Sequence, residues 1–283
     1  HPRMTRHTPI DHVYVGAVSL EVFDDGDMDI HAKSFHFSCL SSIMVNVFSF
    51  CLYGPRNPRY YRPLLENIQI VAQYFPDWKV YIYTAPDVDP EYVKVLQSYS
   101  NVVLRPTGIL GEPNMIRRFM AIDEPDIDVM MVRDADSLIH WRDRWTIYRF
   151  LEQKDYVAHT IRDHRCHASR IMGGLWGIRK SSGLVIANEY EEYRKNPTNL
   201  GVAHDQNFLG VQLYPKIKDR LWVHCSEGPL VHVSNGIETI MSPQRILNGE
   251  HGEIIPFQWT ENMYCGKVDQ ERPVVKPFTI RAR

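Results

Sequence analysis

The sequence of 283 residues has no long hydrophobic run and no excess of charge of either sign. No apolar run approaches the roughly 20 residues that a membrane helix needs, and the opening residues, HPRMTRHTP, lack the apolar core of a signal peptide. The 32 basic and 34 acidic residues give a formal charge of −2, so nothing attracts the chain generally to nucleic acid or anionic lipid. We therefore expect no nucleic-acid partner, no membrane insertion and a cytoplasmic location.

The chain also lacks a cysteine framework. Its five cysteines are odd in number, widely separated and free of any C-x-x-C spacing: Cys39, Cys51, Cys166, Cys225 and Cys265. Neither a set of disulfides nor a zinc knuckle fits this pattern, so a reducing compartment is expected.

Strand and helix patterns alternate through the first half of the chain. Strands are predicted at 43–54, 78–85, 101–107 and 129–132, and helices at 60–75, 90–99 and 114–123. This alternation is typical of an α/β fold with a mostly parallel central sheet flanked by helices. With 44% hydrophobic residues, the chain can bury the core of one large domain, and we predict a single domain over residues 1–283.

The second half and the chain ends follow different patterns. Short strands are predicted at 156–163, 172–180 and 220–226, with a helix at 183–193 and a short helix after His204. Residues before about 43 are irregular, and the acidic stretch FDDGDMD at 23–29 fits a solvated turn better than a calcium loop. The end of the chain, rich in proline and glycine, is expected to form a packed tail.

Two aspartates one residue apart follow the apolar strand at 129–132. Asp134 and Asp136 flank Ala135 at the carboxyl end of that strand, which is the edge where open α/β sheets bind ligands. Carboxylate oxygens at this spacing suit Mg²⁺ or Mn²⁺ holding a substrate diphosphate. The alternative is a solvated turn that caps a helix after Ser137.

Two further segments carry candidate residues. Gly173 and Gly174 precede Trp176, as expected where the main chain approaches a flat or ring-shaped ligand, although a bulged strand with a core tryptophan fits equally. Asp205 begins a short amphipathic helix in HDQNFL, where it can be functional or simply an N-cap.

The order of these motifs resembles that of metal-dependent glycosyltransferases of the GT-A fold. The resemblance extends from about Val45 to Gly266 and includes the strand followed by DxD, the Gly-Gly-Trp segment, the Asp-Gln helix and the strand ending in LWVH. FSFCLYGPRNPRYYRPLLENI and HDQNFL are similar to enzymes of bacteria and of large algal viruses that glycosylate their own capsid protein. Among these, the chain looks most like chlorovirus transferases that add xylose to the capsid glycan.

The resemblance implies an activity and a cofactor. It implies transfer from a nucleotide sugar, UDP-xylose above all, to a hydroxyl of a growing oligosaccharide or glycoprotein glycan, with Mn²⁺ or Mg²⁺ bound. Asp134 and Asp136 match the metal-binding motif, and His224 matches the histidine that completes the metal shell, with His232 as its competitor. If the chain is viral, the location would be the host cytosol.

The resemblance also divides the chain and assigns substrate contacts. It implies a nucleotide-binding half at about 43–140, an acceptor-side half at about 141–266 and a C-terminal tail at 267–283. Inverting transfer needs a carboxylate base, for which Asp205 is the first candidate and Asp163 the second. The implied donor contacts are Phe50 and Tyr53 for uridine and Arg118, Arg133 and Asp134 for the diphosphate. The Gly173, Gly174 and Trp176 segment is the further candidate for substrate binding. Solvated or helix-pairing roles are the alternative for Arg117 and Arg118.

Other activities remain open at this point. A retaining glycosyltransferase that uses another UDP- or GDP-sugar is one, since Asp-Gln also occurs in retaining relatives. A carbohydrate-binding protein that kept the fold and lost the reaction is another. A haloacid-dehalogenase-like phosphatase fits less well, because the last position of its motif would be Leu138 and the motif lies in the middle of the chain.

Overall fold

The structure is a computed structural model that describes residues 44–164, 167, 169–196, 203–226, 230–234, 237–241, 246–247, 249–256 and 264–267. Within 230–241 only the main chain is described. The acidic turn expected at 23–29 lies outside these residues, as does the tail expected at 267–283 except for Lys267. The prediction of a single domain over 1–283 therefore stays a prediction.

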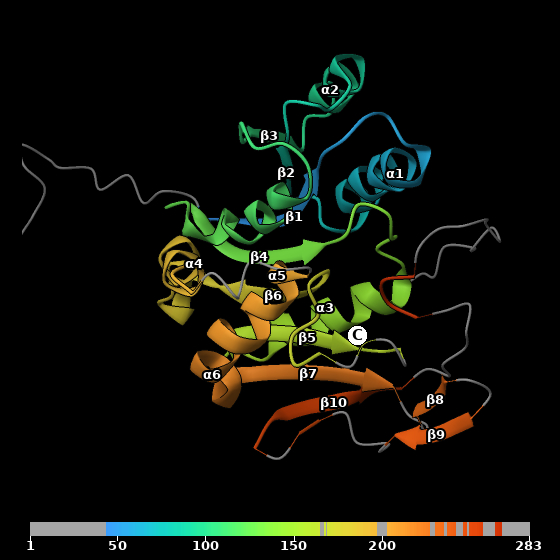
Figure 1. Ribbon diagram of the computed structural model, residues 1–283, viewed down its shortest axis with the longest axis vertical. Coiled ribbons are helices and arrows are strands. Elements are labelled where there is room, and N and C mark those ends of the chain that lie inside the picture. Colours follow the sequence, from blue (N-terminus) through green and yellow to red (C-terminus); the bar gives the residue numbers. More distant parts are fainter. Residues whose placement is uncertain are drawn as a thin grey trace, which may run out of the picture. The chain divides into compact units, whose positions relative to one another are not determined.

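An eight-stranded sheet forms the centre of the described region, in the order β10-β7-β5-β6-β4-β1-β2-β3 (Figure 1). Every strand runs parallel to its neighbours except β6, which is antiparallel to both β4 and β5. This topology confirms the predicted α/β fold with a mostly parallel sheet. The strands are β1 (Val45–Leu52), β2 (Lys79–Thr84), β3 (Val102–Pro106), β4 (Ile127–Arg133), β5 (Ala158–Arg162), β6 (Leu175–Arg179), β7 (Leu221–Ser226) and β10 (His251–Ile255).

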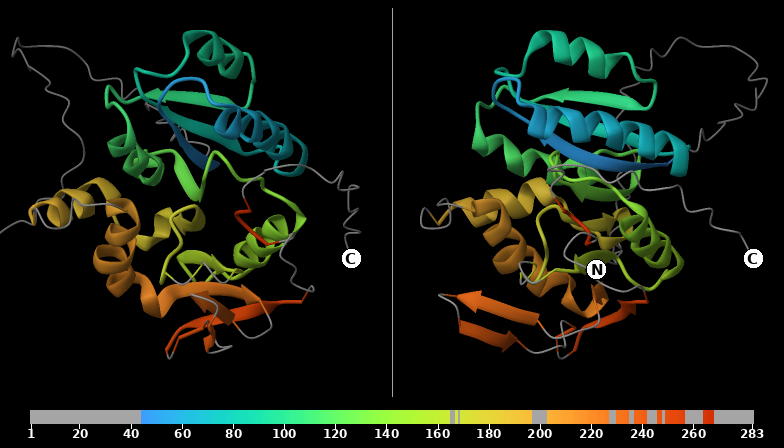
Figure 2. Two further views of the ribbon diagram at one scale, coloured as in Figure 1. Left: turned by 45° about the vertical axis from the view of Figure 1, so that its right-hand side comes forward. Right: turned by 90° about the vertical axis from the view of Figure 1, so that its right-hand side faces the viewer.

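Helices cover both faces of this sheet (Figure 2). Alternate residues of β1 point to opposite faces: Phe48 and Phe50 pack with Leu64 of α1 and Phe150 of α3, whereas Val47 belongs to the other layer. The first layer contains α1 (Pro58–Tyr74), α2 (Pro90–Gln97) and α3 (Trp141–Glu152). The second contains the 3₁₀ helix η1 (Glu112–Phe119), α4 (Ile186–Arg194) and α5 (His204–Phe208).

Shorter elements complete the described chain. The 3₁₀ helices η2 (Ala121–Asp123), η3 (Lys180–Ser182) and η6 (Lys218–Arg220) are single turns. The π-helical turn η5 (Leu209–Leu213) and α6 (Tyr214–Ile217) extend the helix that begins with α5. A separate antiparallel pair consists of β8 (Leu230–Ser234) and β9 (Ile237–Met241).

The helix predicted at 114–123 is wrong in type, because the segment forms two 3₁₀ helices, η1 and η2. The Asn114 side chain donates hydrogen bonds to the main-chain carbonyls of Leu52 and Tyr83, near the ends of β1 and β2. This anchor ties the start of η1 to the sheet, and tertiary contacts of this kind override local helix propensity.

The strands β8, β9 and β10 have no counterpart among the predicted elements, and α3 corresponds only to the helix after Ser137 in the solvated-turn alternative. The N-cap of α3 is His140, whose Nδ1 accepts from the main-chain N–H of Arg142, and histidine is not a usual capping signal. The strand β10 is short and half-polar, and Glu253 within it bonds Arg149 of α3 and His224 of β7. Contacts with distant segments therefore define β10 more than its local residue pattern does.

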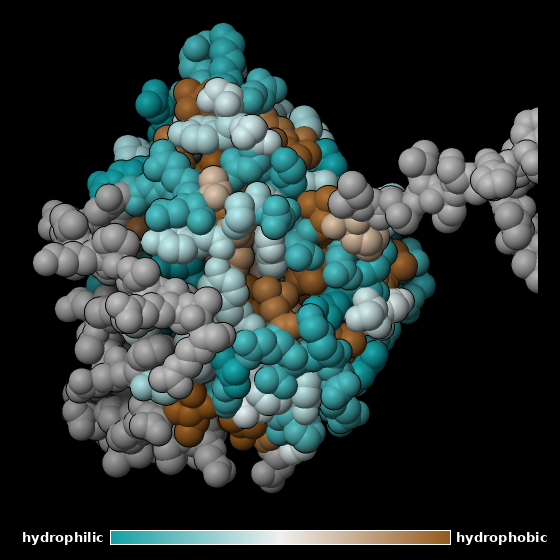
Figure 3. Space-filling view, turned by 180° about the vertical axis from the view of Figure 1, so that it is seen from behind, coloured by the Kyte–Doolittle hydropathy of each residue, from teal (hydrophilic) through white to brown (hydrophobic). Residues whose placement is uncertain are grey.

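The surface of the described region has no continuous apolar face in the view from behind (Figure 3). Hydrophobic side chains there form several separate patches among hydrophilic ones. None of the described helices is long and apolar enough to cross a membrane.

A buried ion pair joins β4 to α3. Arg133 donates from Nε and Nη2 to the two carboxylate oxygens of Asp143, at 3.0 and 2.6 Å, and both side chains are 1% exposed. The remaining guanidinium nitrogen donates to the carbonyl of Trp176 in β6 at 3.2 Å. Arg133 thus connects three elements immediately before the two aspartates.

We predict that Asp143→Ala lowers the free energy of unfolding by about 3–5 kcal/mol, because the buried guanidinium of Arg133 would lose its counter-charge. Urea denaturation would measure this loss. Asp155→Ala, at an exposed position in the turn before β5, should stay within about 0.5 kcal/mol of the wild type. Equal stability of the two variants would show that the Arg133–Asp143 pair does not stabilise the fold.

Candidate functional site

The carboxyl edge of the sheet gathers segments that are far apart in the sequence. β1 and β4 are parallel neighbours, so Tyr53 and Asp134 follow them at the same edge. Because β6 is antiparallel to β4 and Arg133 pairs with Leu175, the residues that precede β6 come to this edge as well. Those residues are Gly173 and Gly174.

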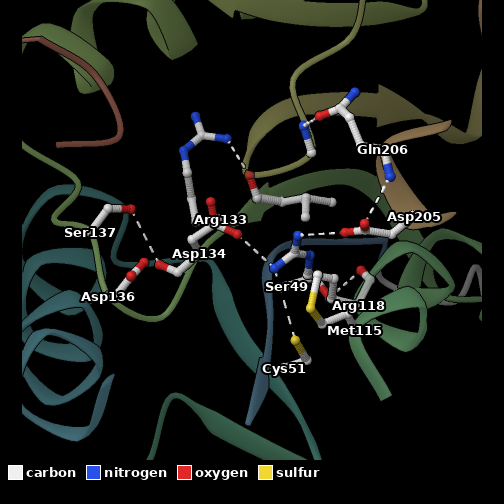
Figure 4. Close-up of polar contacts among 12 residues, drawn as sticks. Ser49, Cys51, Met115, Arg118, Arg133, Asp134, Asp136, Ser137, Asp205 and Gln206 are labelled. Carbon is white, nitrogen blue, oxygen red and sulfur yellow. Dashed lines mark hydrogen bonds and ion pairs between the residues drawn. The ribbon is translucent and has the colours of Figure 1, made fainter. Parts of the chain in front are cut away.

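Arg118 of η1 links the first aspartate of the DxD motif to Asp205 (Figure 4). Its Nη1 donates to Oδ1 of Asp134 at 2.7 Å, and its Nη2 donates to Oδ2 of Asp205 at 3.3 Å. Ser49 of β1 holds the main chain of this arginine through a hydrogen bond of 2.6 Å to its carbonyl. Burial alone would lower the pKa of Arg118, but the two carboxylates raise it, so the guanidinium stays charged.

The two glycines bring the main chain close to this network. A Cβ on Gly174 would lie 2.0 Å from Oδ2 of Asp134, and one on Gly173 would lie 3.3 Å from Oε1 of Gln206. The close approach expected at Gly173 and Gly174 is therefore made to side chains of the site itself. Position 174 accepts no side chain unless Asp134 moves.

The second aspartate has a different partner. Asp136 accepts from Nε and Nη2 of Arg59, in the first turn of α1, at 3.1 and 2.8 Å. Burial and the charge of Asp134 raise the pKa of Asp136, and Arg59 opposes that rise. Both DxD aspartates thus contact an arginine, one buried and one at the surface.

Asp205 lies in the first turn of α5, but it is not the N-cap that the alternative interpretation required. Ala203 occupies the N-cap position, in the left-handed region at φ 58°. Oδ1 of Asp205 accepts from the main-chain N–H of Gln206 at 2.8 Å, while Oδ2 faces Arg118. The carboxylate is 4% exposed and belongs to the same network as Asp134.

Three of the expected donor contacts lie inside the core. Phe50 and Trp176 have no exposed surface, and Arg133 is committed to Asp143 and main-chain carbonyls. Trp176 packs edge-on against Phe119, as expected for the alternative in which this residue is a core tryptophan. Tyr53 is half-buried, with its hydroxyl on Met115 Sδ, and it remains a candidate.

The structure does not bring His224 to the aspartates. Its Nδ1 is 2.8 Å from Nε2 of His159, and its Nε2 is 3.0 Å from Oε1 of Glu253, so both ring nitrogens have partners. Two strands, β5 and β6, separate β7 from β4, which at about 4.8 Å per strand is roughly 14 Å. We therefore leave His224 out of the metal shell. The side chain of His232 lies outside the described residues.

Asp163, the second candidate base, is also committed elsewhere. It forms a two-pronged ion pair with Arg142 at 2.7 and 2.8 Å and accepts from Ser226 and from the main-chain N–H of Cys265. Although burial raises the pKa of Asp163, these partners lower it overall. Its position favours anchoring Tyr264–Lys267 to β5 over proton transfer.

Two residues of the site were missed by the sequence interpretation, Arg59 and Gln206. Gln206 accepts from the N–H of Gly173 at 2.9 Å and donates to the carbonyl of Ile171, and so holds the glycine segment against α5. Its place next to Asp205 in the Asp-Gln pair was a usable signal. Nothing in the local pattern around Arg59 indicates its partner 77 residues away.

The aspartate pair fits a divalent cation that is shared with a substrate. Mg²⁺ in proteins is commonly held by one or two carboxylates together with substrate phosphates, and among the described residues no cluster of three or more His, Cys, Asp or Glu side chains is placed to hold a metal alone. Asp134 retains 44% exposure of its side chain, and no hydrogen bond from a described residue reaches its Oδ2. Asp134 and Asp136 would supply the protein ligands.

Comparison with protein-family models and with curated protein sequences gives no match. Solved structures with a similar fold include a glycosyltransferase involved in the glycosylation of the major capsid of PBCV-1, at 14% identity and TM-score 0.44, covering 64% of this chain and 84% of that one. The galactosyltransferase LgtC in complex with donor and acceptor sugar analogs is similar at 13% identity and TM-score 0.43, covering 63% and 73%. A 4-diphosphocytidyl-2C-methyl-D-erythritol synthase from Anaerococcus prevotii is similar at 11% identity and TM-score 0.43, covering 64% and 87%.

His224 contacts both His159 and Glu253, and these two buried histidines predict that the stability of the protein depends on pH. Burial lowers the pKa of both histidines below the usual 6.5, so the folded protein binds fewer protons there than the unfolded chain does. Stability is then full above about pH 6.5 and falls as the pH drops below it, by at most about 1.4 kcal/mol per pH unit for each histidine.

Melting temperatures between pH 7 and pH 5 would measure this effect. His159→Gln should reduce the slope, and His251→Gln, at an exposed histidine of β10, should leave it unchanged. A slope that is the same in all three proteins would mean that the buried pair does not titrate on unfolding.

Proposed function

We propose that this protein is a GT-A-type glycosyltransferase, which transfers a sugar from a nucleoside diphosphate donor to a hydroxyl of an acceptor glycan. The observation that carries the proposal is the placement of Asp134 and Asp136 at the carboxyl edge between β1 and β6. Arg118 connects this pair to Asp205 on a separate helix. Sugar transfer from a nucleotide needs groups that stabilise the leaving diphosphate, and inverting transfer also needs a carboxylate base.

The resemblance of the motif order to GT-A enzymes supports the same conclusion. The turn interpretation of the DxD segment is less favoured, because both carboxylates bind arginines from other elements and neither caps α3. A divalent cation bound by Asp134 and Asp136 would neutralise charge on the leaving diphosphate.

The residues of the chain then have distinct roles. Arg118 orients the carboxylate of Asp134, and Gly174 leaves the space that this carboxylate occupies. Gln206 holds the main chain at Gly173 against α5, next to Asp205. Asp205 would accept the proton of the acceptor hydroxyl, for which a positioned base contributes roughly 10²–10⁴-fold in rate. Tyr53, after β1, would contact the nucleoside.

The donor we propose is UDP-xylose, on the resemblance to chlorovirus capsid-glycan transferases, and the acceptor is a growing glycan. We propose inversion at the anomeric carbon. One observation favours retention as the second candidate: Asp205 is 4% exposed and paired with Arg118, which restricts its access to an acceptor. Product anomers read by NMR separate the two, and donor hydrolysis over a panel of UDP- and GDP-sugars identifies the donor.

UDP binding should require both the metal and the aspartates. Calorimetry with Mn²⁺ should show binding to the wild type and a large loss with EDTA, Asp134→Asn or Asp136→Asn, because each change removes a ligand or the ion. Gly174→Ala should weaken binding as well, since its Cβ displaces Asp134, whereas Gly210→Ala, with no atom within 4 Å of its Cβ, should not. Unchanged UDP affinity in EDTA would rule out the metal-dependent site.

Turnover should depend on Asp205 separately from binding. Asp205→Asn keeps the shape and a hydrogen bond from Arg118 but removes the basic carboxylate, so kcat per folded molecule should fall by about 10²–10⁴-fold while Mn²⁺-dependent UDP binding persists. The melting temperature should fall as well, because buried Arg118 loses one of its two counter-charges. Asp219→Asn, at an exposed position, serves as the matched control. A fully active Asp205→Asn enzyme would show that Asp205 is not the base.

A further inference from the structure

The two arginines that contact the DxD motif differ in how firmly they are held. Arg118 is 5% exposed and has two carboxylate partners, and Ser49 fixes its main chain. The side chain of Arg59 is 53% exposed, and both of its contacting nitrogens reach a single oxygen, Oδ2 of Asp136. Arg59 can therefore leave its aspartate more easily than Arg118 can.

The main chain at Arg59 is held at the start of α1, whereas its side chain is largely exposed. The Asn57 side chain caps α1 by accepting from the main-chain N–H of Arg59 at 3.0 Å, and Pro58 starts the helix. The guanidinium thus extends from a rigid helix end to the DxD turn. Among the described residues, Asp136 is its carboxylate partner.

We propose that Arg59 exchanges partners during donor binding: it neutralises Asp136 in the free protein and binds the donor diphosphate once a divalent cation takes that carboxylate. The inference rests on the proposed function and adds a donor-binding residue to it. A guanidinium and a cation compete for the same oxygen lone pairs on Oδ2. Once released, the guanidinium lies beside the site with its planar set of donors free, and this geometry suits phosphate oxygens.

The exchange predicts effects of opposite sign on two equilibria. In the wild type, Mn²⁺ must displace Arg59 from Asp136, and an exposed ion pair of this kind is only weakly stabilising. Removing Arg59 should therefore tighten the binding of Mn²⁺ alone by about two- to fivefold. The same change removes charge-assisted hydrogen bonds to the diphosphate and should weaken UDP binding in saturating Mn²⁺ by about tenfold or more. A purely structural role for Arg59 would weaken both.

The experiment compares Arg59→Gln and Arg59→Lys with Arg62→Gln. Arg62 is a suitable control because it is 57% exposed on the same helix and pairs with Glu66. Free Mn²⁺ is counted by its EPR signal in titrations without nucleotide, and UDP binding is measured by calorimetry in saturating Mn²⁺. Arg59→Gln should shift the two constants in opposite directions, Arg59→Lys should fall between it and the wild type, and Arg62→Gln should match the wild type.

Each outcome decides one of the two claims. If the wild type binds Mn²⁺ and UDP but Arg59→Gln changes neither constant, or changes both in the same direction, the exchange is wrong and the proposed function stands. If the wild type binds neither Mn²⁺ nor UDP, the proposed function fails and the exchange fails with it.

Discussion

The contact on which the site depends is the double ion pair of Arg118. A guanidinium that is 5% exposed has lost most of its hydration, and it is tolerated there because Asp134 and Asp205 supply negative charge from two sides. The same contact joins the turn after β4 to helix α5, whose sequences are about 70 residues apart. The carboxylate proposed for the metal and the carboxylate proposed for proton transfer are therefore positioned by one side chain.

Much of the fold could be predicted, because in the first half of the chain the local residue patterns agree with most of the strands and helices that form. Apolar runs such as 129–132 are buried on both faces, as parallel strands require, and α1 begins with Asn57 and Pro58, which are common helix-start residues. The elements that were missed depend on distant partners. β10 contains Glu253, which contacts Arg149 and His224, and η1 is anchored by Asn114 to carbonyls of β1 and β2. Local sequence patterns do not reveal such contacts, because the partners are far apart in the sequence.

The site could be predicted only where a motif coincides with the edge of the sheet. Asp134 and Gly174 come together because one follows β4 and the other precedes β6 at this edge, and Arg118 joins Asp205 of α5 to them. His224 is also on a strand of this sheet, but two strands, β5 and β6, lie between its strand β7 and β4, and strand order is not readable from sequence. The roles of the arginines were the least predictable, because the ionic partners of Arg118, Arg133 and Arg59 lie on other elements. These partners decide whether the side chain is a buried link between elements or a surface contact.

The proposed sugar transfer requires Asp134 and Asp136 together to bind a divalent cation that carries a nucleoside diphosphate. Crystals grown with MnCl₂ and UDP, measured at a wavelength where manganese scatters anomalously, test this directly. We expect an anomalous peak in contact with both carboxylates and with the diphosphate oxygens. A manganese peak elsewhere in the protein, or UDP bound with no metal at these two aspartates, would contradict it.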